Sequence, residues 1–62
     1  MIWLSEILIG EHELASFSDL RISVQRHAAD GERFFGIDVK PQFADTPENW
    51  EAVLESIFTA RV

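Results

Sequence analysis

The absence of cysteine from a chain of only 62 residues limits what the chain can fold into. Small secreted domains usually depend on disulfides or on a metal site, and without thiols neither a disulfide scaffold nor a thiolate zinc site can form. We therefore predict one small domain over 1–62, held by a single hydrophobic core. So short a chain buries only about 60% of the surface that its unfolded form exposes, and a partner or a second copy would add stability. The missing thiols also favour a reducing, cytoplasmic setting.

The composition predicts a folded chain rather than a disordered one, although the net charge is −6. Apolar residues make up 47% of the sequence, with five phenylalanines and two tryptophans, whereas disordered chains have few aromatics. The N-terminal run MIWLSEILIG lacks the basic region of a signal peptide, carries Glu6 and is too short to span a membrane. We interpret 2–9 as a buried strand, because Ile7 and Ile9 are β-branched. Whether 1–19 forms one strand, two strands or a helix stays open.

The dipeptide Asp30-Gly31 lies between two apolar runs and predicts a β-hairpin, because Asp-Gly supplies the positive φ angles of a two-residue type I′ turn. The predicted strands are 20–29 and 32–40. With residues 29 and 32 facing each other, the aliphatic side chains of both strands share one face, and a one-residue slip would turn them away. These side chains are Ile22, Val24, Ile37 and Val39. Gly36, in the second strand, indicates a bulge or a close aromatic neighbour.

The stretch PENWEAVLESIFTA predicts an amphipathic helix over about 47–60. Thr46 suits the N-cap, and Pro47 suits the first helical position, where its missing N–H would be unpaired anyway. The apolar residues recur with a 3.6-residue period and form one stripe, which consists of Trp50, Val53, Leu54, Ile57 and Phe58. Because this stripe needs a surface to pack on, the predicted fold class is α+β: a small antiparallel sheet of three to four strands, including the hairpin, with the helix packed on one face.

Acidic residues gather around this helix without compensating cations. Glu48, Glu51 and Glu55 fall on one flank of the predicted helix and Asp45 precedes it, while 44–58 contains no Lys or Arg. One interpretation is a solvated helix whose first acids are stabilised by the helix dipole. The other is a functional acidic surface. Further acids lie near the predicted turns, namely Glu11, Glu13, Asp30 and Glu32.

A negative surface repels nucleic acid and attracts basic protein surfaces, so we expect a protein partner and no direct nucleic-acid binding. Trp3 and Phe34 would supply the apolar contacts, because the predicted sheet leaves one face without a cover. Either a homodimer or a target protein would bury that face.

The sequence contains no catalytic, cofactor or metal signature, and we expect neither an enzyme nor a bound cofactor. Its three glycines are spread singly and match neither the dinucleotide nor the P-loop pattern. The tripeptide Glu11-His12-Glu13 offers too few converging ligands for a metal ion, because neighbours in an extended chain point to opposite faces. We interpret His27 as a packed or surface histidine.

These properties lead to one hypothesis for function and two alternatives. The chain would be a small acidic protein-binding module that inhibits a larger nucleic-acid-binding complex by occupying its basic surface, as a mimic of nucleic acid. Small phage or mobile-element inhibitors, including anti-CRISPR proteins, fit this size and charge, and a phage-encoded one would act in the host cytoplasm. The first alternative is a structural subunit or homo-oligomer with no inhibitory role. The second is an antitoxin or immunity protein that covers a basic toxin.

Overall fold

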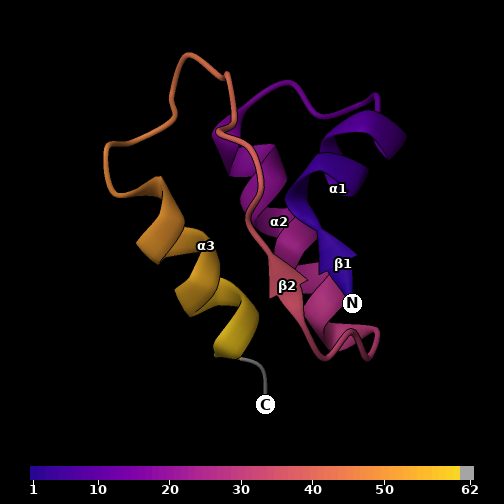
Figure 1. The fold of residues 1–62 in the computed structure, drawn as a ribbon. Coiled ribbons are helices and arrows are strands. Elements are labelled where there is room, and N and C mark those ends of the chain that lie inside the picture. Colours follow the sequence, from indigo (N-terminus) through magenta and orange to yellow (C-terminus); the bar gives the residue numbers. More distant parts are fainter. Residues whose placement is uncertain (61–62) are drawn as a thin grey trace.

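Three helices and two very short strands make up residues 1–60, the part of the chain that the computed structural model describes. In chain order they are β1 (Ile2–Trp3), α1 (Leu4–Gly10), α2 (Phe17–Ala29), β2 (Phe35–Gly36) and α3 (Trp50–Thr59). Helices α2 and α3 pack against each other, β2 pairs with β1, and α1 continues directly from β1 (Figure 1).

The predicted antiparallel sheet of three to four strands with a single helix is wrong. Within residues 1–60 the sheet has two strands, and these run parallel, with Ile2 opposite Phe35 and Trp3 opposite Gly36. The other regular elements of this part of the chain are helices. The chain is therefore small and mostly helical, and its helices rather than a sheet provide most of the packing surface.

Helix α2 replaces the first strand of the predicted hairpin. Its N-cap Ser16 accepts a hydrogen bond from the backbone N–H of Asp19 at 3.1 Å, and the Asp19 carboxylate accepts one from the N–H of Ala15 at 3.0 Å. This reciprocal pattern resembles a capping box and satisfies N–H groups that a helix start leaves unpaired. The buried apolar positions also follow the helical period, since they are Phe17, Leu20, Val24 and Ala28.

The Asp30-Gly31 dipeptide ends α2 instead of turning a hairpin. Gly31 has a φ of +101° and donates to the carbonyl of Ala28 at 3.3 Å, while Glu32 donates to the carbonyl of His27 at 3.2 Å. These two bonds form the Schellman motif, in which a glycine just past the last turn adopts the left-handed conformation. A glycine with positive φ is required both in a type I′ turn and at this kind of helix end. The Asp-Gly dipeptide alone therefore could not distinguish a hairpin from a helix C-terminus.

The N-terminal segment is also helical where a strand over 2–9 was expected. Extended backbone stops at Trp3, and α1 begins at Leu4. Asp38, from the segment after β2, caps this helix: one carboxylate oxygen accepts from the Ser5 N–H at 3.1 Å and the other from the Ser5 hydroxyl at 2.6 Å. The Ser5 hydroxyl bond lowers the pKa of Asp38 below its ordinary value. The helix is thus started by a residue far away in the sequence.

The C-terminal helix is present as α3, but it begins at Trp50 rather than at 47. Thr46 does not cap it, because the Thr46 hydroxyl accepts from the N–H of Phe43 at 3.2 Å. Its apolar stripe packs mainly on α2, and the rings of Phe35 and Phe58 stack with centroids 5.3 Å apart. The stripe therefore meets a helix and one strand, not the face of a broad sheet.

Each helix contributes side chains to one core. Its buried members are Leu4, Ile7, Phe17, Leu20, Val24, Ala28, Trp50, Leu54 and Phe58. Across residues 1–60, none of the helices has both the length and the apolar character needed to cross a bilayer.

Candidate partner-binding surface

The predicted acidic residues of the C-terminal helix form an exposed surface, which we call the α3 acidic flank and define as Glu48, Glu51 and Glu55. Glu51 and Glu55 lie on α3, about 6 Å apart along its axis at a rise of ~1.5 Å per residue. Glu48 is also exposed but precedes the helix. The two ion pairs found over residues 1–60 are Met1 with Glu32 and His27 with Glu11. In that part of the chain the flank therefore carries charge that no cation compensates.

Helix geometry places the flank beside the strands. Glu55 is three positions before Phe58 and Glu51 is seven, so both share the side of α3 that carries Phe58. Since the Phe58 ring stacks on Phe35 of β2, Glu51 and Glu55 lie on the side of α3 nearest the sheet. Ile57 lies on the other side of the stripe.

Asp45 was grouped with these acids from the sequence, but the structure gives it a different role. One oxygen of its carboxylate accepts from the N–H of Phe17 at 2.7 Å, and the other accepts from the N–H of Ser18 at 3.3 Å. The bond from Phe17 is the main reason that the pKa of Asp45 is lowered. Asp45 therefore caps α2 from the segment before α3, and its charge stabilises the positive end of that helix.

Glu11 is part of a small polar cluster with Ser23 and His27 of α2. The fully buried Ser23 hydroxyl donates to one oxygen of Glu11 at 2.6 Å, and Nε2 of His27 lies 2.8 Å from the other. Partial burial raises the pKa of Glu11, but the bonds from Ser23 and His27 and the charges of His27 and Arg26 outweigh it, so the pKa is lowered. The cluster ties the end of α1 to α2.

This cluster differs from a catalytic triad in its order. The carboxylate stands between the serine and the histidine and accepts from both sides, whereas a triad places the histidine next to the nucleophile. Ser23 has no exposed surface. The arrangement can hold two helices together, and it presents no nucleophile to solvent.

Two of the remaining predicted acids, Glu13 and Asp30, lie near opposite ends of α2. Glu13 and Asp30 are both exposed. Glu13 shares a shallow depression with Asp19, near the start of α2, whereas Asp30 follows the end of that helix. A helix of 13 residues is about 20 Å long, so the two acids are well separated. Glu32 pairs with the N-terminal amine at 3.5 Å.

Trp3 and Phe34 lie on the outer face of the two-stranded sheet. Side chains alternate along extended backbone and paired residues point the same way, so Met1, Trp3 and Phe34 share one side while Ile2 and Phe35 face the core. The exposed fractions of these three are 64%, 40% and 65%. We call this set the outer sheet face. The predicted aromatic neighbour of Gly36 is confirmed, because a Cβ on Gly36 would come within 2.3 Å of Cε3 of Trp3.

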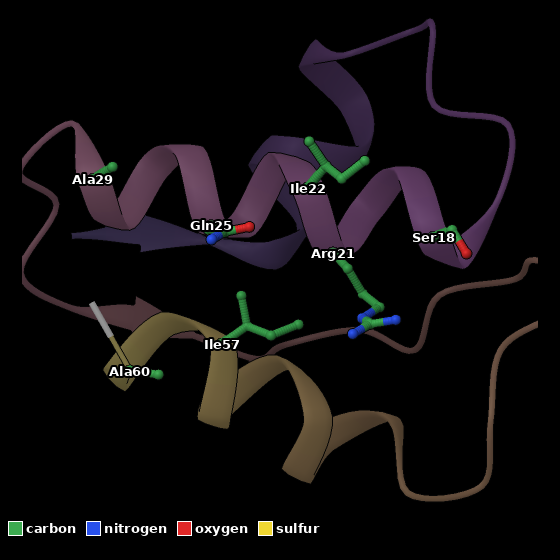
Figure 2. A pocket seen from close by; sticks show the side chains of 7 residues that line it. All are labelled: Ser18, Arg21, Ile22, Gln25, Ala29, Ile57 and Ala60. Carbon is green, nitrogen blue, oxygen red and sulfur yellow. The ribbon is translucent and has the colours of Figure 1, made fainter. Parts of the chain in front are cut away.

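An open groove between α2 and α3 was not anticipated from the sequence. It has a volume of about 660 Å³, and Arg21 points from α2 toward α3 while Ile57 points back (Figure 2). Its lining consists of Ser18, Arg21, Ile22, Gln25, Ala29, Ile57 and Ala60. The groove could not be predicted while 20–29 was interpreted as a strand, because positions 18, 21, 22, 25 and 29 share one side only in a helix. We call it the α2–α3 groove.

No cluster of three or more His, Asp and Glu side chains suited to a metal ion occurs in residues 1–60. Comparison of the chain with protein-family models, with curated proteins and with solved structures yields no match. The functional conclusions below therefore depend on the chain's own surfaces.

Proposed function

We propose that this chain is a small acidic protein-binding module that inhibits a larger nucleic-acid-binding complex by covering the complex's basic surface. The observation that carries the proposal is the α3 acidic flank, whose exposed carboxylates have no cation partner within residues 1–60. Carboxylates make strong charge-assisted hydrogen bonds with Arg and Lys, the residues that hold phosphates in nucleic-acid-binding proteins. The site of action would be the cytoplasm of a bacterial host.

The outer sheet face would supply the apolar part of the interface. Phe34 and Met1 are each more than 60% exposed, and exposed aromatic side chains often anchor protein interfaces. Electrostatic attraction would speed encounter with a basic partner, and burial of these side chains would slow dissociation. Asp45 and Glu11 take no part in this proposal, because their carboxylates bind groups within the chain.

The proposal is tested by affinity capture of the tagged chain from bacterial lysate that contains nucleoprotein complexes, with elution along a salt gradient. We expect a basic nucleic-acid-binding protein that elutes as the salt concentration rises and that DNA or RNA displaces. The triple variant E48Q/E51Q/E55Q should bind it at least tenfold more weakly and with a smaller salt dependence.

The matched control is the triple variant E6Q/E13Q/D30N, which removes the same number of charges from exposed residues that are not part of the flank. If both triple variants weaken binding equally, the net charge and not the flank accounts for the interaction. If neither variant weakens it, the proposal fails.

A second candidate function is a structural homo-oligomer, and the outer sheet face is the observation that favours it. Two copies could bury Met1, Trp3 and Phe34 against each other about a two-fold axis. Analytical ultracentrifugation would then show a dimer whose dissociation constant hardly changes with salt and rises sharply in the variant F34S. A monomer at high micromolar concentration would exclude this candidate.

An antitoxin or immunity protein would use the acidic flank in the same way as the inhibitor, and the identity of the captured partner distinguishes the two.

A further inference from the structure

The α2–α3 groove differs in charge from the rest of this acidic chain. Among its described lining residues Arg21 is the one charged side chain, and it makes no ion pair within residues 1–60. Asp45 reaches the same end of α2, but its carboxylate oxygens accept from the N–H groups of Phe17 and Ser18. The groove therefore offers a cation to a ligand although the net charge of the chain is −6.

The groove is also apolar along most of its length. Ile22 is 60% exposed at its rim, and Ile57, Ala29 and Ala60 line the end away from Arg21 (Figure 2). Ser18 and Gln25 add two uncharged polar groups. The volume of about 660 Å³ lies within the range of sites for small ligands, although this groove is open and would leave part of a ligand in water.

The walls of the groove favour an aliphatic chain over an extended peptide. Both walls are helices, whose backbone N–H and C=O groups bond within the helix except near its ends, so the walls offer few groups for a peptide backbone to pair with. An extended peptide would lose hydrogen bonds to water on entering, whereas an alkyl chain has none to lose. The ligand best suited to these walls is one apolar chain with a single anionic head.

We propose that the α2–α3 groove binds a linear aliphatic carboxylate, with its head paired to Arg21 and its chain against Ile22, Ile57 and Ala29. Arg21 can form two parallel hydrogen bonds with a carboxylate. This inference goes beyond the proposed function, because Ile57 and the acidic flank lie on opposite sides of the apolar stripe of α3.

The test is a titration of the full-length, ¹⁵N-labelled chain with octanoate below its micelle concentration, followed by amide chemical shifts. Acetate serves as a head without a chain, and octylammonium as the same chain with a cationic head. We expect saturable shifts in 18–29 and 57–60 with octanoate and much weaker binding of the other two. A chain of charge −6 would attract octylammonium non-specifically, so a preference for octanoate must come from the groove.

Two variants and one matched control assign the binding to the groove. R21Q should raise the dissociation constant for octanoate about tenfold, because it removes the charge-assisted pair. A29L should weaken binding by filling the apolar end. The control R33Q removes the same charge from an exposed arginine outside the groove and should change the constant less than about twofold.

The proposal is overturned by any of three results: no saturable shift with octanoate, equal binding of octylammonium, or equal weakening by R21Q and R33Q. Saturation of the groove by an acidic peptide but not by octanoate would also overturn it, in favour of a protein ligand. None of these results depends on the glutamates of the acidic flank, so failure here is distinguishable from failure of the proposed function.

Discussion

At the scale of single residues, the contact between Gly36 and Trp3 explains why a glycine stands in β2. A Cβ at this position would lie 2.3 Å from one ring carbon of Trp3 and 2.4 Å from the next, so the indole would have to move off the sheet. We predict that G36A lowers the free energy of unfolding by about 1–3 kcal/mol, through overpacking. The control is G10A, since a Cβ on Gly10 meets nothing within 4 Å and alanine favours a helix. Thermal melts of both variants would contradict this account if G10A were the more destabilising.

Ser23 is the second residue whose role a single substitution can measure. Its hydroxyl is fully buried and donates to Glu11 at 2.6 Å. S23A should lower the free energy of unfolding by about 1–3 kcal/mol, because it removes a hydrogen bond to a charged group. The control S56A changes an exposed serine on α3 and should shift stability by less than about 0.5 kcal/mol. Urea titrations measure both values, and equal effects would show that the Glu11 cluster does not hold α1 to α2.

At the scale of elements, two helices receive their N-terminal caps from one segment of the chain. Asp38 caps α1 and Asp45 caps α2, and both belong to the stretch between β2 and α3. D45N keeps the size of the side chain but removes its charge, so it should lower the free energy of unfolding more than a neutralised acid that caps no helix. E48Q removes a charge close by that contacts no described cation and should have an effect of less than about 0.5 kcal/mol. If the two variants were equally stable in urea, Asp45 would be a surface acid and not a cap.

The end of α2 allows a test of the Schellman motif. Gly31 has a φ of +101°, where a side chain is strained, so G31A should lower the free energy of unfolding by about 1 kcal/mol. G31N should cost less, because asparagine tolerates left-handed backbone better than alanine does. Circular dichroism melts of both variants check the order, and the reverse order would contradict the assigned helix end.

At the scale of the whole molecule, three carboxylates with lowered pKa values link stability to pH. They are Glu11, whose ordinary value is 4.5, and Asp38 and Asp45, whose ordinary value is 3.8. Each is bonded in its ionised form, so its contribution is complete above its ordinary pKa and is lost as the pH falls through the lower folded value. We therefore predict that the urea midpoint is steady from about pH 7 to 5 and falls below about pH 4.5.

The control for this pH dependence is the triple variant E11Q/D38N/D45N, which should be less stable at pH 7 and should lose less stability on acidification. Protonation of the exposed glutamates also relieves repulsion in a chain of charge −6, which acts in the opposite direction. Measurements at about 0.5 M salt screen that repulsion and isolate the three bonded carboxylates. An unchanged pH profile in the triple variant would contradict the assignment.

A sequence pattern predicted the local structure correctly only where it was compatible with a single type of secondary structure. The stripe from Trp50 to Phe58 follows a 3.6-residue period over about two and a half turns, so it identified α3, although the predicted helix began three residues too early, at 47. Leu20 and Val24 are four residues apart and share a face in a helix and in a strand alike, so they could not separate the two. The exposure of Ile22 distinguishes the helix from the strand. In a strand Ile22 would share the buried face of Leu20 and Val24, but in α2 it is 60% exposed.

The sequence by itself determined the charge of the chain, the apolar stripe of its last helix and the exposure of the α3 acidic flank. Only the tertiary structure decided which acids remain for a partner, because a carboxylate can serve as a cap for a helix far away in the sequence. Asp45 and Phe17 are 28 residues apart, and Asp38 and Ser5 are 33 apart. The spacing of residues within one segment cannot predict such long-range pairs, because the pairs depend on how the helices pack. The α2–α3 groove exists for the same reason, because its two walls meet only after the chain has folded.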